Sequence, residues 1–184
     1  MKYLFFYLLT LVFFQGCAIK TGVNNVKTDN FTFFTCKDRN IKNTISESTI
    51  IIKAEELRNC FLDNNDKIVW ISSYWQGCAS QDVINQKKLY DKFKDKVELI
   101  IISETFDIEE IKKIEQQIRY PIYFIDPSYD NSRLKNASEY MKNVLKENVT
   151  EEALKHTNIF IKNGKVIKVA YNSNLSEDLF SSMF

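Results

Sequence analysis

The chain has 184 residues, of which 25 are basic and 24 acidic, so its formal net charge is +1 at neutral pH. A nucleic-acid-binding domain normally concentrates basic residues on one face, and neither the net charge nor any basic cluster indicates such a domain here. The length beyond the apolar N-terminus suits one domain with a substantial hydrophobic core.

The N-terminus reads M-K-Y-L-F-F-Y-L-L-T-L-V-F-F-Q-G-C. One early cation, an apolar run too short to span a bilayer and the small Gly16 predict a secretory signal peptide over residues 1–16. The ending F-Q-G-C resembles a bacterial lipobox, which implies cleavage before Cys17 and attachment of acyl chains such as palmitate to that residue. An ordinary signal peptide with an incidental cysteine and an uncleaved anchor are the alternatives.

Residues 17–30 are polar with little periodicity, and they predict a tether between the lipid and a domain over residues 31–184. No second apolar run of spanning length follows, so we expect contact with the membrane through the lipid anchor. Ala18 follows the cysteine, and by resemblance to enteric bacterial sorting this favours the outer membrane. The domain is then expected to face the periplasm.

Hydrophobic periodicity predicts the elements of the domain. In chain order they are strands at residues 31–35 and 49–52, a helix at 54–62, a strand at 67–72, a helix at 81–94, a strand at 97–103, a helix at 107–117, a strand at 121–125, a helix at 134–145, a hairpin at 158–171 and a last helix at 176–184.

The order of these elements predicts the fold. The apolar runs at residues 67–72 and 97–103 have the length of strands covered on both faces, and the helix between them makes a parallel βαβ unit. Asn163-Gly164 is a strong turn signal for a two-residue hairpin, and the last helix follows it. A βαβ unit followed by a ββα unit predicts an α/β, thioredoxin-like fold: a central mixed sheet flanked by helices, with a short N-terminal extension.

The candidate active-site turn reads S-S-Y-W-Q-G-C-A-S over residues 72–80. With K-I-V-W-I-S before it, K-V-E-L-I-I-I-S after the next helix and H-T-N-I-F-I-K-N-G-K-V-I in the late hairpin, residues 67–171 resemble the membrane-anchored TlpA and redoxin group of thioredoxin-like proteins. In that family the turn carries Trp-Cys-X-X-Cys, in which the first thiol attacks a disulfide and the second resolves the mixed disulfide. Cys78 falls near the second position, and Gln76 follows Trp75 where the first cysteine is expected.

The segment before the late hairpin also lacks a residue that is typical of the family. Family members place a cis-proline before this strand, whereas this chain has His156 between Lys155 and Thr157. A cis bond before a non-proline residue costs roughly 3 kcal/mol, so we expect a trans bond at His156. The resemblance implies that this histidine, the only one in the chain, lies beside Cys78. There the imidazole can lower the pKa of Cys78, can join it in binding Cu(I), or can merely pack.

Three cysteines remain once Cys17 carries the lipid, which is an odd number in a compartment that permits disulfides. Cys60 shares the apolar face of its predicted helix with Leu57 and Phe61, so it is expected in the core. Cys36 and Cys60 can form a structural disulfide that pins the N-terminal extension to the sheet, or either can resolve Cys78. The sequence does not choose among the pairings.

These residues leave different classes of function open. The first is a thiol–disulfide oxidoreductase that works without a cofactor, through the single thiol Cys78 with His156, by mixed disulfides with protein partners. The second is a redox-inactive binding or assembly module, in which Cys78 is a small apolar residue in the first turn of a helix. Copper binding of the Sco kind is less favoured, because Tyr74 stands where that family has its other cysteine.

Overall fold

The computed structural model describes residues 31–41, 48–63, 65–74, 80–130, 132–146, 150–151, 154 and 157–184. The predicted signal peptide, the lipid site Cys17 and the tether lie outside these residues. Among the helices that are described, none is long and apolar enough to cross a membrane.

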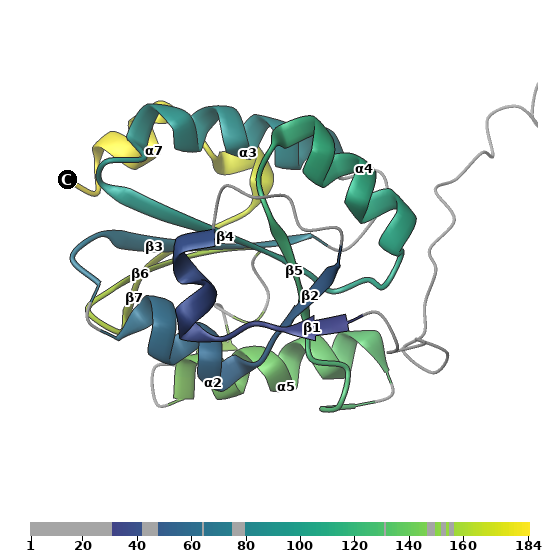
Figure 1. Ribbon diagram of the computed structural model, residues 1–184. Coiled ribbons are helices and arrows are strands. Elements are labelled where there is room, and N and C mark those ends of the chain that lie inside the picture. Colours follow the sequence, from purple (N-terminus) through teal and green to yellow (C-terminus); the bar gives the residue numbers. More distant parts are fainter. Residues whose placement is uncertain are drawn as a thin grey trace, which may run out of the picture.

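The described strands form one mixed sheet, in the order β1-β2-β5-β4-β3-β6-β7 (Figure 1). Their bounds are β1 (Phe31–Phe33), β2 (Thr49–Ile52), β3 (Ile68–Tyr74), β4 (Val97–Ser103), β5 (Ile122–Ile125), β6 (Asn158–Lys162) and β7 (Lys165–Ala170).

The strand directions make this a thioredoxin-like fold, as the sequence predicted. β3 pairs parallel with β4, and helix α3 (Ser80–Phe93) connects the two strands. On its other side β3 pairs antiparallel with β6, which forms a hairpin with β7 before the short helix α7 (Glu177–Ser181). The βαβ unit and the ββα unit therefore share one sheet with β3 at their junction.

The N-terminal extension is part of the same sheet. β1 pairs parallel with β2, and β2 pairs parallel with β5, so the extension adds two parallel strands on the side of the sheet away from the hairpin. The backbone N–H of Phe34 continues the pairing by donating to the carbonyl of Ile51 at 2.8 Å. The chain therefore enters the sheet directly after the predicted tether, as strand β1.

Helices cover the sheet on both faces (Figure 1). One face carries α3, α4 (Ile108–Ile118) and α7; the other carries α2 (Ala54–Leu57), the π-helical turn η2 (Arg58–Leu62) and α5 (Arg133–Leu145). Two 3₁₀ turns complete the described elements, η1 (Cys36–Ile41) after β1 and η5 (Asn172–Asn174) after β7.

Strand β3 is buried on both faces, as its continuous apolar sequence predicted. Val69 and Ile71 point into the core under α2 and α5, whereas Trp70 and Tyr74 point into the core under α3 and α4. The Trp70 ring stacks on Phe160 of β6 with ring centroids 5.6 Å apart. The β3–β6 pairing therefore joins the two halves of the fold through the backbone and through the core.

Two predicted helices have different bounds in the structure. The helix expected at residues 54–62 begins as α2 but continues as a π-turn, in which the N–H of Asp63 donates to the carbonyl of Arg58 at 3.0 Å. The last helix ends at Ser181, earlier than predicted. The hairpin turn is as predicted: Asn163 and Gly164 both have positive φ, 50° and 71°, which a two-residue turn of this type requires.

Two buried tyrosines on different faces of the sheet give a matched stability test. Tyr140 of α5 is fully buried, and among the described residues its hydroxyl has no hydrogen-bond partner. The hydroxyl of Tyr120 donates to the carbonyl of Leu99 at 2.5 Å. Burial raises the pKa of both tyrosines well above the ordinary value.

We therefore predict that Tyr140→Phe raises the free energy of unfolding by about 1 kcal/mol, because it removes an unsatisfied buried hydroxyl, while Tyr120→Phe lowers it by a similar amount. Above pH ~10 the unfolded chain loses phenolic protons that the folded chain keeps, so the unfolding free energy falls with rising pH, and each Phe variant should fall less steeply. Urea unfolding of both variants between pH 8 and pH 11 measures these effects. Equal destabilisation by the two substitutions would contradict the assignment.

Candidate functional site

The residues of the predicted active-site turn directly follow the carboxyl end of β3 in the chain. Cys78, Trp75 and His156 all lie outside the described residues, so their predicted roles stay predictions. The residues that flank them are described. The backbone N–H of Ser73 donates to the carbonyl of Thr157 at 2.8 Å, so the end of β3 and the residue after His156 are hydrogen-bonded neighbours.

Tyr74, the last residue of β3, is fixed in the core beneath α4. Its side chain is 1% exposed, and its hydroxyl donates to Oε1 of Glu110 at 2.9 Å. Burial, together with the hydrogen bond to Glu110, raises the pKa of Tyr74 above its ordinary value. The position four residues before Cys78 therefore holds a neutral, buried phenol rather than a metal ligand.

A cluster of buried and half-buried polar side chains lies between β3, α3 and the segment that follows β7. The sequence did not predict it. We call it the Asn158 network, and its members are Trp70, Ser72, Asp82, Gln86, Thr157, Asn158 and Asn172.

Asn158 is the central member, and its side chain is fully buried. Its Oδ1 accepts from Nε1 of Trp70 at 2.9 Å, and its Nδ2 donates to Oδ1 of Asn172 at 2.7 Å. Gln86 of α3 accepts from the hydroxyl of Ser72 at 2.7 Å and donates to the same Asn172 oxygen at 2.9 Å. These bonds satisfy the polar groups of Trp70, Ser72, Gln86 and Asn158, which are all buried in the core.

The network reaches both segments that flank the predicted thiol site. Nδ2 of Asn172 donates to Oδ2 of Asp82 in the first turn of α3, at 2.9 Å. The hydroxyl of Thr157 donates to Oδ1 of Asn172 at 3.1 Å. The start of α3 and the residue after His156 are therefore held by one amide side chain.

Only weak sequence signals pointed to this network. Ser72 interrupts the apolar run of β3, and Asn158 begins an apolar strand, so both are polar residues at positions expected to be buried. Neither signal identifies its partner, because Asn172 lies beyond the hairpin and Gln86 lies within an amphipathic helix.

A groove of 380 Å³ runs along the surface beside the network, between α3 and the segment from η5 to α7. Carboxylates, amides and amines line it together. Among its lining residues are Asp82, Gln86, Lys88, Lys92, Asn172 and Glu177. Leu89 and Leu175 also line it, so the groove combines charged, amide and apolar groups.

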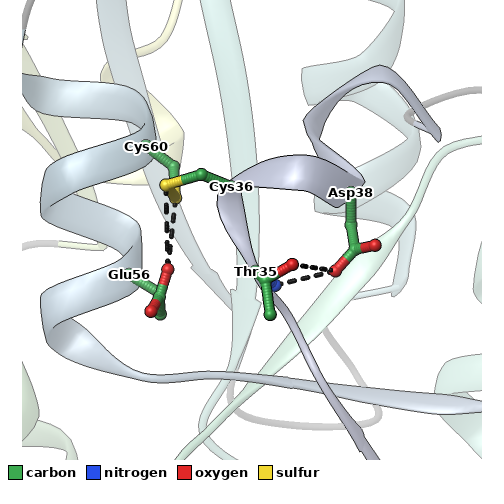
Figure 2. The surroundings of a disulfide bond; sticks show 5 residues. All are labelled: Thr35, Cys36, Asp38, Glu56 and Cys60. Carbon is green, nitrogen blue, oxygen red and sulfur yellow. Dashed lines mark hydrogen bonds between the residues drawn. A yellow bond between two sulfur atoms is a disulfide. The ribbon is translucent and has the colours of Figure 1, made fainter.

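Cys36 and Cys60 form a disulfide, with their Cα atoms 5.1 Å apart (Figure 2). The Cys36–Cys60 pairing is one of the alternatives that the sequence left open. Cys60 is 3% exposed, so its predicted place in the core is confirmed. The bond differs from the expectation in one respect: it joins η1 to the π-turn η2, so it pins the N-terminal extension to a helix that covers the sheet.

The segment around the disulfide is held in two further ways. Asp38 accepts hydrogen bonds from the backbone N–H and the hydroxyl of Thr35, both at 2.8 Å, which fixes the start of η1 (Figure 2). Phe34 stacks on Phe61 at 5.4 Å and packs edge-on against Tyr123 at 5.3 Å. The crosslink itself closes a loop with a sequence separation of 24 residues, for which chain entropy gives roughly 3.5 kcal/mol.

Glu56 lies beside both sulfur atoms of the disulfide. Its Oε2 is 3.4 Å from Sγ of Cys60 and 3.7 Å from Sγ of Cys36. Two cysteines and a carboxylate are a donor set that can hold a soft or borderline metal ion, but the metal ligand is the thiolate. The three residues could therefore hold a metal only after the disulfide is reduced.

Comparison with known proteins gives little beyond this. No protein-family model matches the chain, and no curated protein sequence matches it significantly. Among solved structures the chain is similar to the solution structure of a "putative protein disulfide isomerase" from Bacteroides thetaiotaomicron, with 22% identity over 65% of this chain and 70% of that chain and a TM-score of 0.41. The fold assignment therefore rests on the strand order and directions described above.

The Asn158 network predicts an unequal response to substitution. Asn158→Leu removes the acceptor of the Trp70 N–H and a donor to Asn172, so we expect it to lower the free energy of unfolding by about 2–4 kcal/mol. Thr157→Val removes two hydrogen bonds at the half-buried edge of the network, one to Asn172 and one from Asn158, and we expect a smaller loss of about 1 kcal/mol. Urea denaturation followed by Trp70 fluorescence measures both. Losses of the same size would mean that the network is not centred on Asn158.

Proposed function

We propose that this protein is a lipid-anchored, thioredoxin-like protein of the bacterial envelope that exchanges thiols and disulfides through the single thiol of Cys78. The observation that carries the proposal is the disulfide between Cys36 and Cys60. It occupies two of the cysteines of the mature chain, and the lipid would occupy Cys17. Cys78 is then the thiol left to react with a partner.

The place of Cys78 in the chain supports a reactive thiol. It lies two residues before Ser80, the first residue of the 14-residue helix α3. Backbone N–H groups at the start of a helix favour a negative charge by roughly 0.3 to 1 kcal/mol even when exposed. A thiol at such a position ionises more readily, and the thiolate is the form that attacks disulfides.

The flanking residues support the role proposed for His156. This histidine is bonded directly to Thr157, whose carbonyl accepts from the N–H of Ser73. Cys78 follows Tyr74, the last residue of β3, by four positions in the chain, so we expect both Cys78 and His156 at the carboxyl end of β3. A charged imidazole within reach of the sulfur would stabilise the thiolate.

One thiol can carry out one half of an exchange reaction. The Cys78 thiolate attacks a disulfide of a partner protein, a bond forms between the two sulfurs, and the other sulfur of the partner leaves as a thiolate. A second thiolate from the partner then attacks the mixed disulfide and releases Cys78. A partner with a third cysteine supplies this second thiolate, since attack by the thiolate just released would only restore the original disulfide. The partner disulfide is thereby rearranged, and no net electrons stay on Cys78.

The reactivity of Cys78 is the first test. Alkylation of the folded protein, with Cys36–Cys60 intact, should have a pH midpoint below the ordinary thiol value of about 8.5, and His156→Ala should raise the midpoint by about one pH unit. Lys155→Ala, which removes the neighbouring cation in the same segment, serves as the matched control and should change it much less. Mass spectrometry at each pH identifies the alkylated cysteine.

Two other outcomes have distinct signatures in the same experiment. Protection of Cys78 by Cu(I), reversed by a chelator, would favour a copper site with His156. A midpoint near the ordinary value, unaffected by His156 and by copper, would contradict the exchange function. It would favour a redox-inactive binding module, for which the groove beside α3 offers a binding surface of mixed polar and apolar lining.

The anchor has its own test. We expect Cys17→Ser to move the protein from the washed membrane fraction to the soluble fraction, because the acyl chains contribute roughly 0.8 kcal/mol per buried methylene and the variant lacks them. Mass spectrometry of the wild-type N-terminus should find an acylated Cys17. Unchanged membrane retention of the variant would contradict lipid anchoring.

A further inference from the structure

The surroundings of the Cys36–Cys60 disulfide differ from those of an inert crosslink. The Glu56 carboxylate points at both sulfurs, with Oε2 at 3.4 Å from Cys60 and 3.7 Å from Cys36 (Figure 2). Glu56 stands one residue before the end of α2, and Cys60 follows four residues later within the π-turn of η2. π-turns inside helices are rare and frequent at functional sites.

The contacts of Glu56 change in kind with the redox state of the cysteines. A disulfide sulfur carries no proton, so in the oxidised protein the two short distances are contacts without a donor. In the reduced protein each sulfur carries S–H, which can donate to a carboxylate oxygen at these distances. The carboxylate is therefore positioned to take up a proton from a thiol.

The two sulfurs differ in accessibility. Cys36 lies in the exposed turn η1, whereas Cys60 is 3% exposed and contacts the aromatic core. An incoming sulfur can reach Cys36 directly, and Cys60 can be reached only from Cys36. An accessible sulfur that can react with a partner, next to a second sulfur that can resolve the mixed disulfide, allows a two-cysteine exchange reaction.

We propose that Cys36, Cys60 and Glu56 form a second thiol–disulfide exchange site, separate from Cys78, whose substrates are disulfides and dithiols of partner proteins. Cys36 is the attacking thiol, Cys60 is the resolving thiol, and Glu56 is the base that accepts the proton of Cys60. The site does not use Cys78, whose proposed function concerns the state in which Cys36 and Cys60 are oxidised.

The reaction balances over two steps. The Cys36 thiolate attacks a partner disulfide, forms a mixed disulfide and releases one partner thiolate. Cys60 then transfers its proton to Glu56, attacks the Cys36 sulfur and releases the second partner thiolate, which takes up a proton from solvent or from Glu56. The protein loses two electrons and becomes the Cys36–Cys60 disulfide, while the partner gains them. A partner dithiol regenerates the site by the reverse steps.

Glu56 is needed because Cys60 is buried. A thiol in apolar surroundings resists ionisation, and the thiol form is a poor nucleophile. A base in contact with the sulfur removes the proton as the new bond forms, which typically accelerates such a step by 10² to 10⁴. Attack by Cys36 does not require this help, since it is exposed to solvent.

The experiment separates the two steps. The full chain carrying Cys17→Ser and Cys78→Ser, which leaves Cys36 and Cys60 as its two cysteines, is reduced, freed of reductant and mixed with 5,5′-dithiobis(2-nitrobenzoate), which releases one coloured thiolate for each step. We expect two equivalents per chain in two phases, the second of which Cys60→Ser abolishes, leaving the label on Cys36. Glu56→Gln should slow the second phase at least tenfold and change the first by less than threefold.

Glu55→Gln is the matched control. It removes the same charge from the neighbouring position of the same helix turn, on an exposed side chain. We expect both phases in this variant within twofold of the parent. Equal second phases in the Glu56→Gln and Glu55→Gln variants, or a single phase with both cysteines present, would overturn the proposal.

A second measurement starts from the oxidised, folded protein. Structural disulfides resist reduction by glutathione, whereas exchange sites react with it. We expect excess reduced glutathione to convert Cys36–Cys60 to the dithiol in the Cys78→Ser chain, with the far-ultraviolet circular dichroism of the folded protein retained. A disulfide that persists, or one that opens only as the protein unfolds, would overturn the proposal. Because Cys78 is absent, its thiol contributes to neither outcome, and the alkylation test of Cys78 is a separate measurement.

Discussion

Strand β3 lies between apolar layers on both faces, so each polar side chain that it buries must find its partner inside the protein. Trp70 and Ser72 both do so through side chains of other elements, Asn158 and Gln86 respectively. These two partners in turn converge on Asn172. The burial of one strand thus dictates which polar residues α3, β6 and the segment after β7 must present to it.

This constraint places a rigid frame around the end of β3. Asn172 donates to Asp82 at the start of α3 and accepts from Thr157 just before β6, so it holds both segments. Thr157 is also hydrogen-bonded to Ser73 of β3 through the backbone. The segments that carry Cys78 and His156 both connect to this frame. In α/β sheets ligands bind where the carboxyl ends of the strands meet, and residues there are positioned best by a rigid scaffold.

Hydrophobic patterning predicted most of the fold but could not predict either polar cluster. The apolar runs of β3 and β4, the hairpin at Asn163-Gly164 and the order of elements all followed from local sequence. The π-turn at Cys60 did not, because a segment of 5 residues is too short for its apolar spacing to distinguish a π-turn from an α-helix. The disulfide pairing and the contact with Glu56 depend on the distance between η1 and η2, which no local pattern specifies.

The aromatic cluster beneath the disulfide bears on whether that bond can take part in exchange. A site that cycles must stay folded in both redox states, although the crosslink contributes roughly 3.5 kcal/mol. Phe34, Phe61 and Tyr123 are each at most 3% exposed, and burying one such side chain contributes roughly 1.5–3 kcal/mol. Since Phe34 lies two residues before Cys36 and Phe61 directly follows Cys60, the cluster holds together the same two segments as the bond. The packing can therefore keep the two cysteines side by side while the bond between them opens.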